Sequence, residues 1–412
     1  MAWYQSTYDK TKPVKEVRFA AVLTLTQIIL FSGSSCLIST ANAAEPPFAV
    51  KSEQILLLDA DTGSILFSRK ADVAFPPASL AKLMTAEVAF NALASGTIQP
   101  ETSFTVSEHA WRTGGAPSGT ATMFAKIKSQ LTVNDLIQAI TVQSANDGAI
   151  VLAEGMSGSE QGFALLMNER AQALGLKGSV FSNPTGLPQE GAIQKVTLSD
   201  MLKLAQHLHK TYPQYYPLYA QESFTWNNIM QRNRNPLLRL NIGADGLAMG
   251  GTKDSGFSFV ASAEQNGRRI YLGLNGAKTI QDRTEDAEKL IRWAMSDFVK
   301  LPVFNENSEV AQGSLYGGTQ GSVGLIVHDA VSVLVPVQDK SKLRSQVIYR
   351  GPVAAPVAKG QEIGRLQVLR DKEVLVERPV YAVQDVAEGS LRNKSLDALY
   401  ELATGWIRRL LK

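Results

Sequence analysis

Thiols and metal-ligand patterns are scarce in this chain. Its 412 residues include one cysteine, Cys36, and four histidines. A lone cysteine has no partner for an intrachain disulfide, and the histidines lack metal-ligand spacing, so we predict neither a disulfide nor a metal site. The net charge is only +3 and no basic block occurs, which argues against nucleic-acid binding. No apolar run after residue 43 is long enough to span a membrane.

The first 43 residues have the order of a secretory signal peptide. Basic residues between Lys10 and Arg18 precede an apolar run over 19–31, and Ala41-Asn42-Ala43 provides a small-x-small cleavage site. We predict a signal peptide over 1–43, removed after Ala43. The mature chain is then periplasmic, and Cys36 is lost with the leader.

Ser79-Leu80-Ala81-Lys82 is the only Ser-x-x-Lys in the chain. At the start of a helix, Ser79 and Lys82 lie one turn apart on the same face. A serine hydroxyl becomes a good nucleophile when a neighbouring base takes its proton, and a desolvated lysine can be that base. Alone, the pattern also fits a helix N-cap followed by a solvated lysine.

Ser144-Ala145-Asn146 is the only Ser-x-Asn, and it lies between two helical patterns. The motif therefore falls on a turn, where side chains can point into a cleft. The alternative is a helix C-terminus with an asparagine cap. Ser-x-x-Lys followed by a Ser-x-Asn element is part of the signature of penicillin-binding proteins and class A β-lactamases.

From about Ile55 to its C-terminus the chain resembles the serine-type D-Ala-D-Ala carboxypeptidases, the low-molecular-mass penicillin-binding protein family. Five segments carry the resemblance: 77–85, 143–147, 181–187, 233–238 and 243–247. The resemblance implies an α/β (α+β) penicillin-binding/β-lactamase-like transpeptidase fold. It also implies peptidoglycan stem peptides as substrates, β-lactams as inhibitors, and no metal or organic cofactor.

The third motif departs from the family pattern Asp-Gly-x-Lys-Thr-Gly. Ala248 stands at the position of the family lysine and Met249 at that of the threonine, before Gly250. In the family the lysine helps to bind the substrate carboxylate and orders the second-motif serine. A charge-assisted hydrogen bond contributes roughly 1.5–3 kcal/mol, so its loss predicts about 10- to 100-fold weaker catalysis.

Two other cations are candidates to replace that lysine. If 248–252 is extended, Ala248, Gly250 and Thr252 share a face of the strand and Lys253 points the other way. A bulge at Gly250-Gly251 would shift the alternation and could bring Lys253 round to that face. Arg283 matches a family arginine near the active site. The alternatives are a solvated loop residue for Lys253 and a surface residue at a helix start for Arg283.

The pattern of the chain predicts a serine D,D-peptidase domain over 44–304 and a small β-rich domain over 305–390. In the first, we predict hairpins over 55–67 and 256–275, and helices over 80–93, 133–140, 163–174, 198–208 and 284–298. In the second, alternating segments predict strands over 323–327, 331–335, 347–349, 362–368 and 374–380.

Residues 394–412 predict an amphipathic C-terminal helix. Its apolar residues recur at helical spacing and form one stripe: Leu396, Leu399, Tyr400, Ala403, Ile407, Leu410 and Leu411. Trp406 lies beside this stripe, and basic residues flank it. Such a helix suits the membrane interface, and the family's usual anchor favours peripheral association with the outer face of the inner membrane. The alternative is a helix docked on the β-rich domain.

The resulting hypothesis is acyl transfer. Ser79 attacks the carbonyl between two D-alanines, Lys82 takes its proton, and Ser144 passes a proton to the leaving D-alanine. Asn146 holds the substrate amide. By resemblance, the backbone N–H groups of Ser79 and Gly251 form the oxyanion hole, and Ala248, Gly250, Thr252 and Arg283 complete the substrate-binding set. Two alternatives remain: a catalytically weakened penicillin- or muropeptide-binding relative, and a β-lactamase whose deacylation base we do not find.

Overall fold

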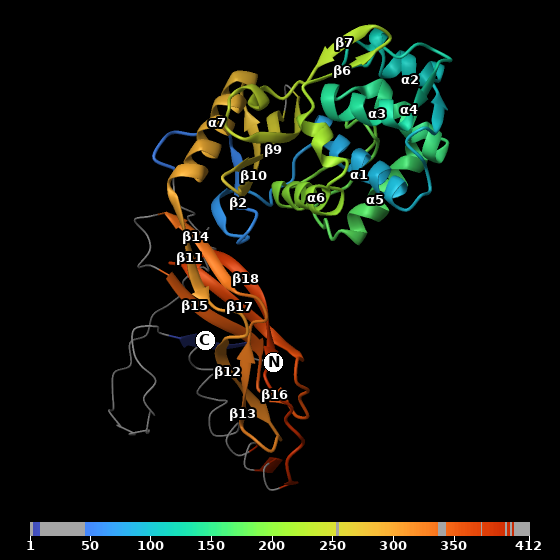
Figure 1. The fold of residues 1–412 in the computed structure, drawn as a ribbon. Helices are drawn as coiled ribbons and strands as arrows, with labels where there is room; N and C mark the ends of the chain where they lie inside the picture. Colours follow the sequence, from blue (N-terminus) through green and yellow to red (C-terminus); the bar gives the residue numbers. More distant parts are fainter. Residues whose placement is uncertain are drawn as a thin grey trace. The chain divides into compact units, whose positions relative to one another are not determined.

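The computed structural model describes residues 3–8, 46–252, 255–336, 343–371, 373–391, 394, 395 and 398 (Figure 1). The chain divides into two compact units. One comprises Ala43–Val299 together with Leu334–Val337, and the other comprises Lys300–Val333 and Gln338–Lys412 with the N-terminal residues. The apolar run of the predicted signal peptide lies outside the described residues.

A five-stranded antiparallel sheet forms the centre of the first unit. Its order is β3-β2-β10-β9-β8, with β2 Gln54–Asp59, β3 Ile65–Arg69, β8 Ala244–Thr252, β9 Gly256–Gln265 and β10 Arg268–Ala277. Both predicted hairpins are confirmed, since β2 pairs with β3 and β9 with β10. The third motif on β8 therefore lies on an edge strand, at the opposite side of the sheet from β3.

One helix packs on the sheet beside the β9–β10 hairpin. Helix α7 spans Ile280–Ser296, and its buried Leu290 and Trp293 pack in one cluster with Phe259 of β9. It begins four residues before the predicted start, because the Thr279 hydroxyl accepts from the Asp282 N–H and caps the helix. It ends before Phe298, where β11 (Phe298–Phe304) begins.

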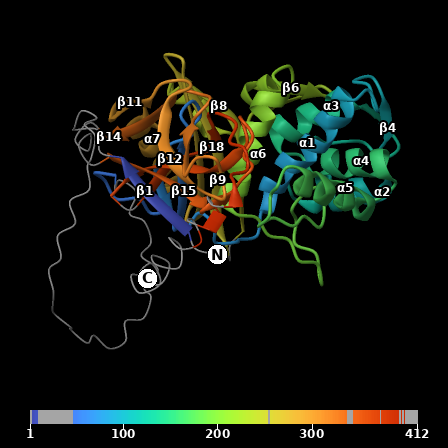
Figure 2. The same ribbon diagram turned by 90° about the horizontal axis from the view of Figure 1, so that it is seen from below.

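The helix-rich part surrounds α1, which spans Ala81–Ala94 and buries 11 of its 14 residues (Figures 1 and 2). A helix buried on all sides needs no polar face. The other helices are α2 Glu108–Thr113, α3 Val133–Gln138, α4 Asn146–Ser157, α5 Glu160–Ala173 and α6 Leu198–Thr211. Short strand pairs join β4 Ser103–Thr105 to β5 Gln130–Thr132, and β6 Ser223–Trp226 to β7 Ile229–Arg232.

The second unit is all β in its described residues before 391. Its seven-stranded sheet has the order β1-β15-β17-β18-β13-β12-β16. These strands are β1 Trp3–Tyr8, β12 Glu309–Tyr316, β13 Ser322–Ile326, β15 Leu343–Arg350, β16 Val353–Ala354, β17 Glu362–Arg370 and β18 Glu373–Ala382. A separate pair joins β11 to β14 (Val331–Pro336).

The five strands predicted for this region are present, as β13, β14, β15, β17 and β18. The sequence pattern missed β11, β12 and β16. Pro302 interrupts the sequence pattern of β11, although the strand continues through it. Strand β16 has only two residues, too few for an alternating pattern. All seven apolar residues of the stripe in the predicted C-terminal helix lie outside the described residues.

Candidate active site

Ser79 lies in a 3₁₀ turn, η1 (Ala78–Leu80), that leads directly into α1. One turn further along, the Lys82 Nζ donates to the Ser79 Oγ at 3.1 Å and to the Thr185 carbonyl oxygen at 2.9 Å. The serine hydroxyl is half-buried, whereas Lys82 is only 3% exposed. Ser79 and Lys82 therefore form a hydrogen-bonded pair with a buried lysine, and the alternative of a helix N-cap followed by a solvated lysine is wrong.

Burial controls the charge of Lys82. Desolvation, followed by the positive charge of Arg234, lowers the pKa of Lys82 to about 7, and the carboxylate of Asp147 partly opposes the shift. A buried ammonium loses hydration and gains no adjacent carboxylate here, so its neutral form is favoured. At neutral pH a large fraction of Lys82 can therefore accept the proton of Ser79.

Ser144 occupies the predicted turn between helices. The chain leaves α3 through a π-helical stretch, Ala139–Gln143, and Ser144 follows with a φ of 57° before α4 begins at Asn146. A non-glycine residue in this left-handed region is uncommon and concentrates at functional sites. Ser144 and Ser79 line one pocket with Lys82, so the structure brings the two motifs together.

The residues after Ser144 anchor a neighbouring loop. Asn146 is 3% exposed, and its Nδ2 donates to the Thr120 Oγ1 at 2.9 Å. Its Oδ1 is buried and has no hydrogen-bond partner in the described structure. Buried polar atoms are normally paired, so this unpaired oxygen is unusual. Asn146 is absent from the lining of the pocket that contains Ser79, so the structure does not bring it to that pocket as it does Ser144.

The fully buried carboxylate of Asp147 orders the same loop. It accepts from the Thr122 hydroxyl at 2.6 Å and from the N–H groups of Met123 and Ala125 at 2.9 and 3.1 Å. Sequence reasoning quoted Asp147 only as part of a motif and assigned it no role. The structure gives it two: it holds the loop, and it acts electrostatically on Lys82.

The third motif lies on β8, where Ala248 and Met249 line the pocket that contains Ser79. A bulge at Gly250-Gly251, the condition considered for turning Lys253 toward the pocket, is absent. The β8–β9 register is regular from Gly246 to Thr252, and its irregularity falls between Ala244 and Gly246. Lys253 itself lies outside the described residues.

Close packing fixes β8 against the nucleophile segment. A Cβ on Gly250 would lie 2.8 Å from the Pro77 carbonyl oxygen and 2.7 Å from the Ser258 Oγ. Gly251 has a φ of 151°, and a Cβ there would lie 2.6 Å from a ring carbon of Phe257. The hydroxyl of Thr252 contacts the Ser255 Oγ at 2.7 Å and accepts from the Ser255 N–H, so it orders the β8–β9 turn.

Arg283 is buried, so its interpretation as a surface residue is wrong. It is 6% exposed, and its guanidinium lies 5.4 Å from the ring centroid of Phe259 and 6.0 Å from that of Phe257. Burial, followed by the charge of Arg234, lowers the pKa of Arg283 to about 10. Arg283 is absent from the lining of the pocket around Ser79.

Arg234 is the cation that sequence reasoning missed. It lines the pocket with Ser79 and Ala248, and its charge lowers the pKa of both Lys82 and Arg283. The flanking Asn233 and Asn235 are buried, and the Asn235 N–H donates to the Asn233 Oδ1. The sequence offers only the alternation of arginine and asparagine over 232–235, which does not by itself place Arg234 in a pocket.

Comparison with known proteins identifies the family. A family model described as D-alanyl-D-alanine carboxypeptidase matches residues 40–279, and one described as penicillin-binding protein 5, C-terminal domain, matches residues 298–388. The chain belongs to the D-alanyl-D-alanine carboxypeptidase family. The predicted family, fold class and enzyme class are thereby confirmed, and the alternative of a weakened binding protein is not favoured.

Individual members of this carboxypeptidase family match over most of their length. D-alanyl-D-alanine carboxypeptidase DacC of Escherichia coli (strain K12) is 33% identical over 87% of this chain and 90% of its own. Penicillin binding protein 5 from Haemophilus influenzae matches with a TM-score of 0.70 and 30% identity, over 84% of this chain and 100% of that one. Penicillin-binding protein D2 from Listeria monocytogenes, solved in an ampicillin-bound form, matches 60% of this chain and 98% of its own, with a TM-score of 0.52 and 27% identity.

Among the described residues of the carboxypeptidase, no helix combines the length and the hydropathy of a membrane span. No group of three or more histidine, cysteine or acidic residues in the same part of the chain is arranged to hold a metal ion.

Proposed function

We propose that the chain removes the terminal D-alanine from peptidoglycan stem peptides through an acyl-enzyme on Ser79, and that β-lactams acylate the same hydroxyl. The observation that carries the proposal is the 3.1 Å contact between the Lys82 Nζ and the Ser79 Oγ. A buried lysine whose pKa is lowered to about 7 can take the serine proton at neutral pH.

In the first step, the Ser79 Oγ attacks the carbonyl carbon between the two D-alanines and its proton moves to the Lys82 Nζ. The developing oxyanion accepts hydrogen bonds from the N–H groups of Ser79 and Gly251, an assignment taken from the family. Lys82 then returns this proton by way of the Ser144 hydroxyl, which gives its own proton to the departing nitrogen and takes the one from Lys82; the C–N bond breaks, and D-alanine leaves. Water hydrolyses the remaining ester and restores Ser79, while Asn146 holds the peptide by its amide.

We propose that Arg234 supplies part of the charge that the third motif lacks, and that a lysine at position 248 would add to it. Ala248 offers no cation, whereas Arg234 lines the same pocket with its guanidinium exposed. A guanidinium can bind a carboxylate through two parallel hydrogen bonds. In this arrangement the substrate's terminal carboxylate is bound by Arg234 and the β8 backbone. Arg283 does not line this pocket, and its guanidinium lies over the rings of Phe257 and Phe259.

Restoring the family's third motif should increase the activity. We expect the double substitution Ala248→Lys with Met249→Thr to raise kcat/KM for D-alanine release from a D-Ala-D-Ala peptide by roughly 10-fold or more, the size of one charged hydrogen bond. D-alanine release measures this directly. Thr225→Lys, which adds the same charge at an exposed position on β6, is the matched control and should leave the rate unchanged.

A fast wild type with no gain in the double variant would show that another cation already does the lysine's work. A wild type that is acylated by penicillin but releases no D-alanine would contradict the proposed carboxypeptidase activity.

We further propose that residues 1–43 direct export to the periplasm and that residues 394–412 bind the outer face of the inner membrane. The cations at the C-terminus should be drawn to anionic lipid, so salt should weaken binding without abolishing it. Truncation before Lys394 should release a protein from liposomes that still reacts with penicillin. Equal partitioning of the truncated and untruncated mature proteins would contradict the anchor.

A further inference from the structure

A groove rich in arginine adjoins the catalytic pocket. It has a volume of ≈ 730 Å³, and its lining includes Arg232, Arg234 and Arg239 but no acidic residue. Asn233 and Arg234 line both the groove and the pocket that contains Ser79, so the two are neighbours. We call this feature the arginine groove.

The local backbone forces these side chains outward. Gln231, Asn233 and Asn235 are 4%, 5% and 3% exposed, whereas the intervening Arg232 and Arg234 are exposed. The buried amides are fixed: the Asn233 Nδ2 donates to the Tyr219 carbonyl oxygen at 3.0 Å, and the Asn235 Nδ2 donates to the Gly246 carbonyl oxygen at 3.0 Å. The segment cannot rotate its arginines inward without breaking these bonds.

Arg239 lies at the end of the 3₁₀ turn Pro236–Arg239 and reaches back to the segment that holds Arg232 and Arg234. Its Nη2 donates to the Asn233 carbonyl oxygen at 3.1 Å, which holds the guanidinium beside the same segment. Within the described ranges, no ion pair connects Arg232, Arg234 or Arg239 to a carboxylate. Glu222 lines an adjoining hollow with Arg232 and Arg239, but no ion pair joins it to either.

Three neighbouring guanidinium groups that have no ion pair to a described carboxylate create a positive potential that an anionic ligand relieves. Carboxylates fit best, because the planar fork of arginine matches their geometry. We propose that the arginine groove is an accessory subsite for peptide carboxylates outside the terminal D-Ala-D-Ala. This inference rests on the proposed function, and it extends substrate selection beyond the two residues at the scissile bond.

Two sources of such carboxylates are distinguishable by experiment. One is the amino side of a linear stem peptide. The other is a second peptide strand attached through the leaving amine, as in a cross-linked substrate. Each is prepared with free carboxyl groups and in an amidated form, and the ratio of kcat/KM for the two forms is measured on the same protein sample. Partial misfolding cancels in that ratio.

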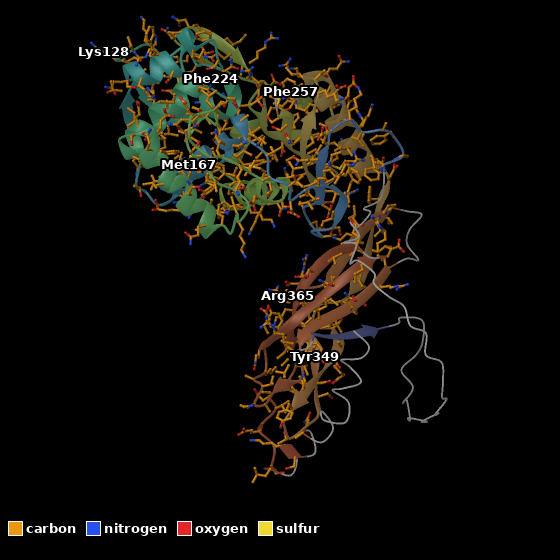
Figure 3. All side chains as sticks on the ribbon, turned by 180° about the vertical axis from the view of Figure 1, so that it is seen from behind. Lys128, Met167, Phe224, Phe257, Tyr349 and Arg365 are labelled. Atoms are coloured by element: carbon orange, nitrogen blue, oxygen red, sulfur yellow. The ribbon has the colours of Figure 1, made fainter. Side chains whose placement is uncertain are left out.

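The wild type should prefer the free-carboxyl form of at least one source by about 10-fold, as expected for two charge-assisted contacts at an open site. The double substitution Arg232→Gln with Arg239→Gln should reduce the ratio to near 1. Lys126→Gln with Lys128→Gln removes the same charge from a nearby loop that contributes no lysine to the groove, and it should keep the wild-type ratio. Lys128 is labelled at the outer edge of the helix-rich part in Figure 3.

Binding of the same peptides to the Ser79→Ala protein separates this inference from the carboxypeptidase itself. A preference in Kd for free carboxyls that disappears in the Arg232/Arg239 variant supports the groove even if no D-alanine is released. Equal Kd and kcat/KM for the free and amidated forms of both sources would overturn it. So would a preference that survives the double arginine substitution.

Discussion

Ser79→Ala should abolish both D-alanine release and acylation by benzylpenicillin. We expect a fall in kcat/KM of at least about 10³-fold, since removing the nucleophile removes the covalent route altogether. Mass spectrometry of wild-type protein treated with penicillin should place the adduct on the peptide that contains Ser79. Rate and adduct together test the nucleophile directly.

Ser95→Ala provides the matched control at the other end of α1. Ser95 is the C-cap residue of that helix, and its hydroxyl contacts only the Ala92 carbonyl and Thr97 among the described residues. It should keep wild-type labelling. An adduct on any other residue, or a Ser79→Ala protein that still labels, would rule out the assignment.

Lys82→Met should reduce acylation by about 10²- to 10⁴-fold, the usual contribution of a positioned base. Methionine keeps the unbranched shape of the buried stem but cannot take a proton. In the wild type, kcat/KM should rise with pH and level off above about 7, because Lys82 is protonated and inactive as a base below its lowered pKa. This acid limb should vanish in the variant.

Lys203→Met is the control for that substitution. Lys203 lies on α6, and its Nζ donates to the Gly175 carbonyl oxygen at 3.2 Å, outside the pocket lining. Its pH profile should match the wild type. A limb near pH 10 in the wild type, or one that persists unchanged in Lys82→Met, would mean that another group is the base.

The parts of the site that sequence predicts are those set by local geometry. Ser79 and Lys82 share a helical face because they are three residues apart, and Ser144 falls on a turn because helical patterns stop on both sides of it. The β9–β10 hairpin follows from alternation around a short polar turn. Each of these depends on residues close together in the chain.

What sequence could not predict depends on distant contacts. Lys82 is buried and held by the Thr185 carbonyl, which is 103 residues away. Arg234 enters the pocket because buried asparagines and the Tyr219 carbonyl hold its segment, and no local pattern encodes that approach. The position of the irregularity in β8 has the same cause. Two glycines at 250 and 251 would allow a bulge, but pairing with β9 places the irregularity between Ala244 and Gly246.

The contacts of Leu334 limit where this protein can be truncated or recombined with a relative. Leu334 is 3% exposed within the apolar cluster around α7, and its N–H donates to the Ser64 Oγ at 2.9 Å. A stop codon or a proteolytic cut soon after residue 304 would remove it. Emptying a buried leucine site costs about 2–5 kcal/mol, a large share of the roughly 5–15 kcal/mol that holds a domain folded. Recombination between relatives should therefore favour crossovers beyond residue 336, so that the peptidase inherits its last core residue with the rest.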